Sequence, residues 1–335
     1  MNRFGPLVDP VIHTDWSAGT LLAAVIAAVG IGLLLAASAS MLMQRRSRDP
    51  AVVARLEAMV WIWSGLLALL MLAGVVGRTA NIAAFAVLSF QALREFFSLI
   101  HTRRADHWAL LAAFFVVLPA QYLLIWFDWY GLFAILLPVY VFLLLPVIPA
   151  LRGDTTRYMD RIAEVQWGLM ISVYCVSHIP ALLDLEIPGY GGRQTLLIVF
   201  LIMVALAADQ VRSEVAHWWQ PPRLQPAHLQ PTGAEVAAAI TTGGLVGVLL
   251  GPITPFGAAI AGGLGIVVAM MGLAGRLVLG AIKRDRGIDD WRQPAVAATP
   301  AASVAASGGG LLDRLDILIF AAPVYFHLTR FLFTA

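Results

Sequence analysis

Acidic and basic residues are concentrated in one segment of this 335-residue chain, between positions 275 and 316. The segment holds five acids and six bases, although long apolar stretches surround it. Charged side chains beside membrane spans tend to line a site or a pathway, because hydrocarbon does not solvate them. Interleaved carboxylates and cations suit reactions that bring anions together, such as transfer between phosphate groups. The sequence therefore places the candidate site in this segment.

One base in this segment stands out by its type. Lys283 is the single lysine among the 22 basic residues of the chain. Two interpretations of it stay open: an amine that is needed beside the acids, or an ordinary cation at the membrane interface. Neither composition nor spacing decides between them.

The elements that must position these residues follow from composition. Sixty per cent of the residues are hydrophobic and 13% are charged, with a mean hydropathy of +0.83. A soluble domain carries roughly a quarter charged residues. We therefore predict an all-α, polytopic integral membrane protein with about ten transmembrane helices. The single cysteine, Cys175, excludes an intramolecular disulfide, and no His/Cys spacing is typical of a zinc site.

Ten apolar runs approach the roughly 20 residues that a helix needs to cross a bilayer. They are Gly19–Met43, Met59–Val76, Ile82–Ile100, His107–Phe127, Tyr130–Ala150, Val165–Leu185, Gln194–Ala208, Ala234–Leu250, Pro255–Ile282 and Leu315–Phe333. We divide the chain into an N-terminal region of about seven spans, residues 1–233, and a C-terminal region, residues 234–335, that carries the charged segment. The polar insertion Arg212–Gly233 is predicted to be an irregular loop, because it is rich in proline and glutamine.

The distribution of basic residues between loops predicts the orientation. Alternate loops hold sixteen basic residues, and the intervening loops with the N-terminus hold three. Cytoplasmic loops carry the excess of Lys and Arg, so both termini should face away from the cytoplasm and the charged segment should face into it. We expect a protein of the bacterial inner membrane with a cytoplasmic active site, and no nucleic-acid partner.

Glycines are unusually frequent in the ninth predicted span. Gly262, Gly263, Gly265, Gly272 and Gly275 all lie there. Small residues let membrane helices approach closely, so we interpret these glycines as helix-packing positions.

The charged segment also carries an ordered set of residues that resembles the signature of the phosphatidate cytidylyltransferases (CDP-diacylglycerol synthases). The matching positions are Gly275, Leu277, Lys283, Arg284, Gly287, Asp290, Gly309, Gly310, Asp313, Arg314 and Asp316. Leu93-Arg94-Glu95-Phe96 resembles a feature at the end of an early span of that family, and Asp209 lies where the family has an Asp-Thr-Gly-type turn.

This resemblance implies a reaction and a set of roles. The reaction is CTP-dependent conversion of phosphatidic acid, or a related anionic lipid, to CDP-diacylglycerol, with Mg²⁺ as cofactor, membrane lipids as surroundings and a possible homodimer. Implied catalytic residues are Lys283, Arg284, Asp290 and Arg314. Implied metal ligands are Asp313, Asp316 and Asp209, and implied substrate-binding residues are Arg276, Gly309 and Gly310.

Four positions depart from the family pattern. The metal-binding aspartate that follows the first glycine is Arg276 here, and the other departures are Gly280, Asp289 and Gly308. Arg276 could grip a phosphate bidentately in place of a metal ion, or it could form a salt bridge with Asp313 and close the site. Two functions therefore stay open: an active cytidylyltransferase, or an inactive family member that binds a lipid or a partner membrane protein. A transporter is disfavoured, because the acids lie at span ends.

Overall fold

The structure is a computed structural model that describes residues 77–99, 103–104, 106–219, 231–288, 291 and 310–334, with five further positions between 19 and 27. These residues are all-helical and contain no strand. The helices from residue 77 onward are α3 Gly77–Phe97, α4 His107–Ala112, η1 Ala113–Val117, α5 Leu118–Trp126, α6 Tyr130–Ile135, η2 Leu136–Val141, α7 Phe142–Leu144, α8 Val147–Ala150, α9 Tyr158–Leu169, η3 Met170–Cys175, α10 Val176–Ala181, η4 Leu182–Asp184, α11 Thr195–Trp219, α12 Gly233–Leu250, η5 Gly251–Ile253, α13 Ala258–Asp285, α15 Leu311–Ile319 and α16 Ala321–Phe333.

Seven continuous helical stretches in the described residues are long and apolar enough to cross a membrane. They are His107–Trp126, Tyr130–Ala150, Tyr158–Asp184, Thr195–Ala216, Gly233–Ile253, Ala258–Asp285 and Leu311–Phe333. The chain is therefore a polytopic membrane protein, and seven of the ten predicted spans correspond to these stretches. The predicted spans Gly19–Met43 and Met59–Val76 lie almost wholly outside the described residues. Ile82–Ile100 corresponds to α3, a helix that is not among the seven.

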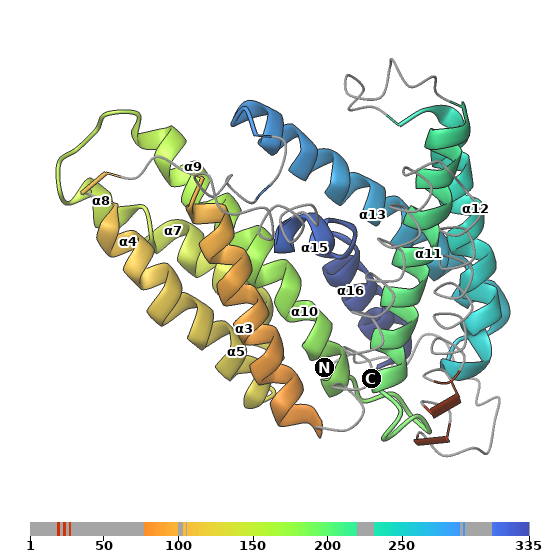
Figure 1. The fold of residues 1–335 in the computed structure, drawn as a ribbon. Coiled ribbons are helices and arrows are strands. Elements are labelled where there is room, and N and C mark those ends of the chain that lie inside the picture. Colours follow the sequence, from red (N-terminus) through yellow and green to blue (C-terminus); the bar gives the residue numbers. More distant parts are fainter. Residues whose placement is uncertain are drawn as a thin grey trace, which may run out of the picture.

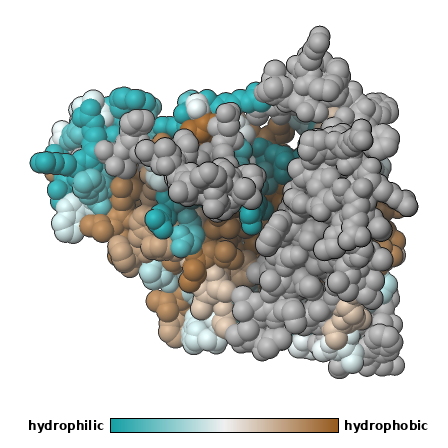
Figure 2. Space-filling view, in the orientation of Figure 1, coloured by the Kyte–Doolittle hydropathy of each residue, from teal (hydrophilic) through white to brown (hydrophobic). Residues whose placement is uncertain are grey.

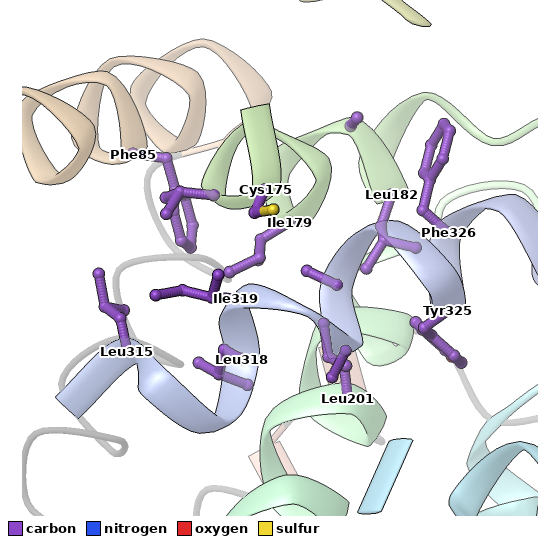
Figure 3. Packing of buried hydrophobic residues seen from close by; sticks show 14 of the residues in the cluster. Phe85, Cys175, Ile179, Leu182, Leu201, Leu315, Leu318, Ile319, Tyr325 and Phe326 are labelled. Carbon is purple, nitrogen blue, oxygen red and sulfur yellow. The ribbon is translucent and has the colours of Figure 1, made fainter. Parts of the chain in front are cut away.

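The last two helices lie in the middle of the bundle. In Figure 1, α15 and α16 run between α3 and α10 on one side and α11 to α13 on the other. Figure 3 shows the core at this point, where Phe85 and Ile179 lie on the side of Ile319, Leu182 lies on the side of Phe326, and Leu201 approaches from α11. All of these side chains are buried. The segment with the candidate site thus leads directly into the buried core of the described residues.

Helix α13 packs against α12 through glycines. A side chain at Gly265 would overlap the backbone oxygen of Gly243, and one at Gly247 would overlap that of Ala261. These close approaches confirm most of the predicted packing role. Gly263 is the exception, because a side chain there would have nothing within 4 Å.

The predicted loop Arg212–Gly233 is wrong over its first part. Helix α11 continues to Trp219, so Asp209 lies within a helix and not in a turn. Its polar residues extend one face of the helix beyond the apolar run. Further on, α12 begins at a capping box in which the Glu235 N–H donates to Oγ1 of Thr232 and the Thr232 N–H donates to Oε1 of Glu235, both at 3.3 Å.

Candidate active site

Two ion pairs join α13 to α15. Nζ of Lys283 lies 2.6 Å from Oδ1 of Asp313, and Nε of Arg276 lies 3.3 Å from Oδ2 of Asp316. The bases are seven residues apart on α13 and the acids three apart on α15, so each pair of like residues shares one helical face. As the spacing of the acids predicts, both carboxylates face the same neighbour.

Glycines bring these two helices close enough for the pairs to form. A side chain at Gly275 would overlap the backbone oxygen of Asp316, and a Cβ at Gly272 would lie 3.1 Å from the backbone oxygen of Ile317. Arg276 directly follows the tightest of these positions. The Gly275-Arg276 dipeptide therefore combines backbone contact with a cation aimed at the same turn of α15.

Arg276 also reaches α11. Its Nη2 lies 2.9 Å from Oδ2 of Asp209, whose other oxygen is 2.9 Å from Nη2 of Arg212. Arg212 in turn contacts Glu235 of α12 at 3.3 Å. The result is a charge chain, Asp316–Arg276–Asp209–Arg212–Glu235, that alternates in sign across four helices.

The two end members of this charge chain, Asp316 and Glu235, are buried, whereas Arg276 is partly exposed. Glu235 is 4% exposed and Asp316 is 8% exposed, whereas the side chain of Arg276 is 38% exposed. Burying a charge is costly unless it is paired and hydrogen-bonded, which the alternation of sign provides. Arg276 is therefore the member most able to meet an incoming anion. The pairing also corrects the possibility of a salt bridge between Arg276 and Asp313. Arg276 contacts Asp209 and Asp316, whereas Asp313 contacts Lys283.

Asp313 is fixed from two directions. Its Oδ2 accepts the Gly310 N–H at 3.0 Å, across the first turn of α15, and the Trp291 N–H at 3.3 Å. Its Oδ1 is left to Lys283. The carboxylate thus serves both as a helix-start residue and as the counter-ion of the single lysine.

A residue from an early helix completes the start of α15. Oε1 of Glu95 accepts the Leu311 N–H at 3.0 Å and Oε2 accepts the Leu312 N–H at 2.9 Å. A side chain at Gly310 would overlap Glu95, which explains why a glycine is required there. The ring of Phe96, beside Glu95, stacks on Trp291 at 5.6 Å between centroids. The short match Leu93–Phe96 was the only sequence signal for this contact.

A cavity of ≈ 500 Å³ opens beside these residues, between α3, α9 and α13. Phe96, Trp167 and Trp291 give it aromatic walls. Arg286 and Glu164 also line it, and they form an ion pair at 2.7 Å. Its size falls in the usual range of small-molecule sites, roughly 300–1,000 Å³.

The remaining predicted residues divide into two groups. Arg284 and Arg314 are exposed, on α13 and α15 respectively. Asp290 and Gly309, like the departures Asp289 and Gly308, lie outside the described residues. Gly310 lies at the start of α15 against Glu95, a position that makes it structural as much as substrate-binding.

The carboxylates implied as metal ligands do not form one donor set in the described part of the chain. Asp209 and Asp316 share the guanidinium of Arg276, and Asp313 contacts Lys283. Within that part, no group of three or more His, Cys, Asp or Glu side chains could hold a metal ion. As arranged, these residues do not fit a magnesium centre. A magnesium cofactor stays a prediction from the resemblance.

Helices long and apolar enough to cross a membrane, joined by a chain of paired charges, define a polytopic integral membrane protein with a charged site. The model of the Cytidylyltransferase family matches residues 53–332. A protein of Escherichia coli (strain K12), described as "Uncharacterized protein YnbB", is 30% identical over 265 residues, which cover 76% of this chain and 80% of that protein. The chain belongs to the cytidylyltransferase family.

Proposed function

We propose that this protein transfers the cytidylyl group of CTP to the phosphate of phosphatidic acid, which yields CDP-diacylglycerol and pyrophosphate. Family membership supports the cytidylyl transfer. The observation that carries the proposal is the set of cations at the α13–α15 contact, where Lys283 and Arg276 face paired carboxylates. Trp291, whose N–H donates to Asp313, also lines the cavity of ≈ 500 Å³. The helical membrane fold supports a lipid as the acceptor.

The chemistry requires charge neutralisation more than covalent help. A phosphate oxygen of the lipid attacks the α-phosphorus of CTP, a new P–O bond forms, the bond to the β-phosphate bridging oxygen breaks, and pyrophosphate leaves with the electron pair. Every reactant is an anion, so fixed cations near the reacting phosphates lower the barrier. Lys283 and Arg276 are the bases that the fold holds at this position.

Binding of a phosphate at Arg276 requires an exchange of partners. Its guanidinium contacts Asp209 through Nη2 and Asp316 through Nε, and a phosphate that replaces one carboxylate can accept from two of its nitrogens. Arg212 already contacts Asp209, so that carboxylate keeps a counter-ion after the exchange. The charge chain can therefore accept an anion without leaving a buried carboxylate unpaired.

We place the site on the cytoplasmic side in this proposal, because CTP is a cytoplasmic nucleotide. The distribution of arginines between loops supports this orientation. Reporter fusions after Arg161 should give a cytoplasmic signal, and fusions after Gly191 should not. The opposite result would remove the route by which CTP reaches the charged segment.

Turnover in a defined bilayer tests the function. Purified full-length protein in nanodiscs should release pyrophosphate from CTP when phosphatidic acid is present, at a rate followed with labelled CTP over a range of Mg²⁺ concentrations. Asp313→Asn should lose this activity. Glu186→Gln should keep it, because Glu186 is an exposed acid in the loop before α11, away from the charge chain.

One observation favours a second function. Arg276 is already paired with the carboxylates of Asp209 and Asp316. This pairing would also suit a closed site in an inactive family member that binds a lipid or a partner membrane protein. The same assay separates the two. Absence of pyrophosphate release with CTP, phosphatidic acid and Mg²⁺ all in excess would establish the inactive alternative.

A further inference from the structure

A second charged and apolar region lies at the outer edge of the bundle. We call it the corner groove: a hollow of ≈ 680 Å³ along α4, η1 and α8. Its lining residues are Trp108, Leu111, Ala112, Phe115, Val116, Ile148, Leu151 and Arg152. Phe115 is 68% exposed and Leu151 is 83% exposed, so the apolar wall is open to the surroundings of the protein.

A basic hollow of ≈ 510 Å³ adjoins one end of the corner groove. Arg103, Arg104, Arg152 and Asp154 line it, and Arg152 is common to both hollows. The guanidinium carbon of Arg152 lies 5.5 Å from the centre of the Trp108 ring, where a cation–π contact holds it between the apolar wall and the basic end. The two hollows therefore meet at Arg152, one of them basic and the other apolar.

The basic end keeps an excess of positive charge. Asp154 is its one acid, and this carboxylate contacts Arg161 at 3.1 Å and Arg103 at 3.5 Å. Arg161 also contacts the buried Asp106 at 3.2 Å. Asp106 and Asp154 thus balance two of the four positive charges of Arg103, Arg104, Arg152 and Arg161. The remaining positive charge can attract an external anion.

We propose that the corner groove binds one anionic phospholipid, whose phosphate lies among Arg103, Arg104 and Arg152 and whose acyl chains cover Trp108, Leu111 and Phe115. A phospholipid has the same order of parts: an anion, an interfacial region and long hydrocarbon. Tryptophan and arginine are typical of the level where headgroups meet hydrocarbon. Figure 2 shows hydrophilic residues gathered over this corner with hydrophobic surface beneath them.

This site is separate from the candidate active site. In Figure 1, α4 and α8 lie at one edge of the bundle and α15 lies near its centre. None of the residues that line the corner groove belongs to the charge chain or to the cavity beside it. The proposal therefore does not depend on the reaction proposed above, and it concerns a lipid that is bound without being converted.

Charge complementarity selects a lipid over a second copy of this chain. A symmetric contact between two copies would set the same arginines against each other, since each copy presents the same patch to the other. Like charges across such an interface are repulsive. An anionic headgroup removes this repulsion, and the exposed apolar wall matches hydrocarbon.

Native mass spectrometry of the detergent-purified full-length protein tests the proposal. With added phosphatidylglycerol, the wild type should retain one lipid more tightly than it retains phosphatidylcholine. Arg152→Gln should weaken retention about fivefold, and Arg104→Gln with Arg152→Gln about 25-fold, at roughly fivefold for each basic residue near an anionic headgroup. Arg193→Gln is the matched single-charge control, because Arg193 lies outside the groove in the turn before α11, and it should leave retention unchanged.

Two further arms identify the occupant. Leu111→Ser should weaken retention of the lipid, whereas added glycerol phosphate should not compete, because it lacks the acyl chains. Unchanged retention in the double arginine variant, equal retention of phosphatidylcholine, or full competition by glycerol phosphate would each overturn the proposal. A dimer that Leu111→Ser dissolves while lipid retention stays unchanged would also overturn it, and would identify a second copy as the occupant.

Discussion

Helix α13 contacts two neighbours through glycines, but only one of the two contacts carries charge. Towards α12, the glycines of α13 meet Gly243 and Gly247 backbone to backbone. Towards α15, Gly272 and Gly275 allow an equally close approach, and Arg276 and Lys283 add ion pairs to Asp316 and Asp313. The α12 contact shows that close packing of this helix does not need ion pairs.

The comparison bears on why the charges exist. An ion pair that is removed from water gains little net stability over apolar packing, because desolvation offsets the attraction. A contact that served only to join α13 to α15 could therefore rely on glycine packing alone, as the contact between α13 and α12 does. The charges on the α15 side are better explained by chemistry than by assembly.

The largest effect is expected from a side chain in the uncharged contact. Gly265→Leu should destabilise the fold by about 3 kcal/mol or more, because even its Cβ would overlap the backbone of Gly243. Size-exclusion chromatography of a fluorescent fusion after heating would measure the loss of folded protein. Gly263→Leu is the control at the same helix, since it meets nothing within 4 Å. Equal stability of the two variants would contradict the packing role of the α12 contact.

Removal of one carboxylate from the charged contact should act on turnover more than on stability. Asp313→Ala should lower CTP turnover by more than about a hundredfold, because Lys283 loses the partner that fixes it. Loss of the helix-start hydrogen bond should cost only about 1 kcal/mol. Thermal unfolding and pyrophosphate release, measured on the same sample, separate the two effects. A folded and fully active Asp313→Ala variant would show that the charged contact is structural.

Reversal of the charge at position 276 should create a cation requirement. Arg276→Asp places a third carboxylate between Asp209 and Asp316, so the folded protein should bind Mg²⁺ and gain about 1.4 kcal/mol at ten times the dissociation constant. The control is the wild type, whose melting temperature should not respond to Mg²⁺. A variant whose melting temperature ignores Mg²⁺ would show that the backbone does not hold these acids as a metal site.

The smallest effect is expected at a surface charge outside both contacts. The Thr156 N–H donates to Oδ1 of Asp154, and this hydrogen bond holds the pKa of the Asp154 carboxyl below its ordinary value. A lowered pKa stabilises the fold above the unfolded-state value of about 3.9, and that contribution disappears as the pH falls through the folded-state pKa. The melting temperatures of wild type and Asp154→Asn should therefore differ slightly at pH 6 and converge below about pH 4. A difference that grows on acidification would contradict this direction.

The membrane fold was accessible from sequence because hydropathy is a local property. Seven predicted spans correspond to helices that are long and apolar enough to cross a membrane, and Asp313 and Asp316 lie on one face as their spacing requires. The end of α11 was missed because the residues after Asp209 are polar. A helix does not stop where its apolar run stops when another helix supplies partners, as Glu235 does for Arg212.

The pairing of the site residues was less accessible. A salt bridge from Arg276 to Asp313 was one of two possibilities left open, but the partner Asp209 is 67 residues away in sequence, on a helix that no local pattern links to α13. Glu95 stood out only through a four-residue match, and its role depends on the backbone N–H groups of α15. Side-chain chemistry can be read along a chain, whereas contacts between distant helices depend on packing that composition does not encode.

The hydrogen bonds of Glu95 also have a consequence for how the protein is made. Glu95 and Leu311 are 216 residues apart, so α3 leaves the ribosome long before its two backbone donors exist. Until α15 is synthesised, the growing chain must keep an acidic side chain at the end of an early helix without these donors. Helix α15 therefore completes the hydrogen bonds of a side chain that lies in the first third of the chain. A product released before position 311 would lack both of these backbone donors.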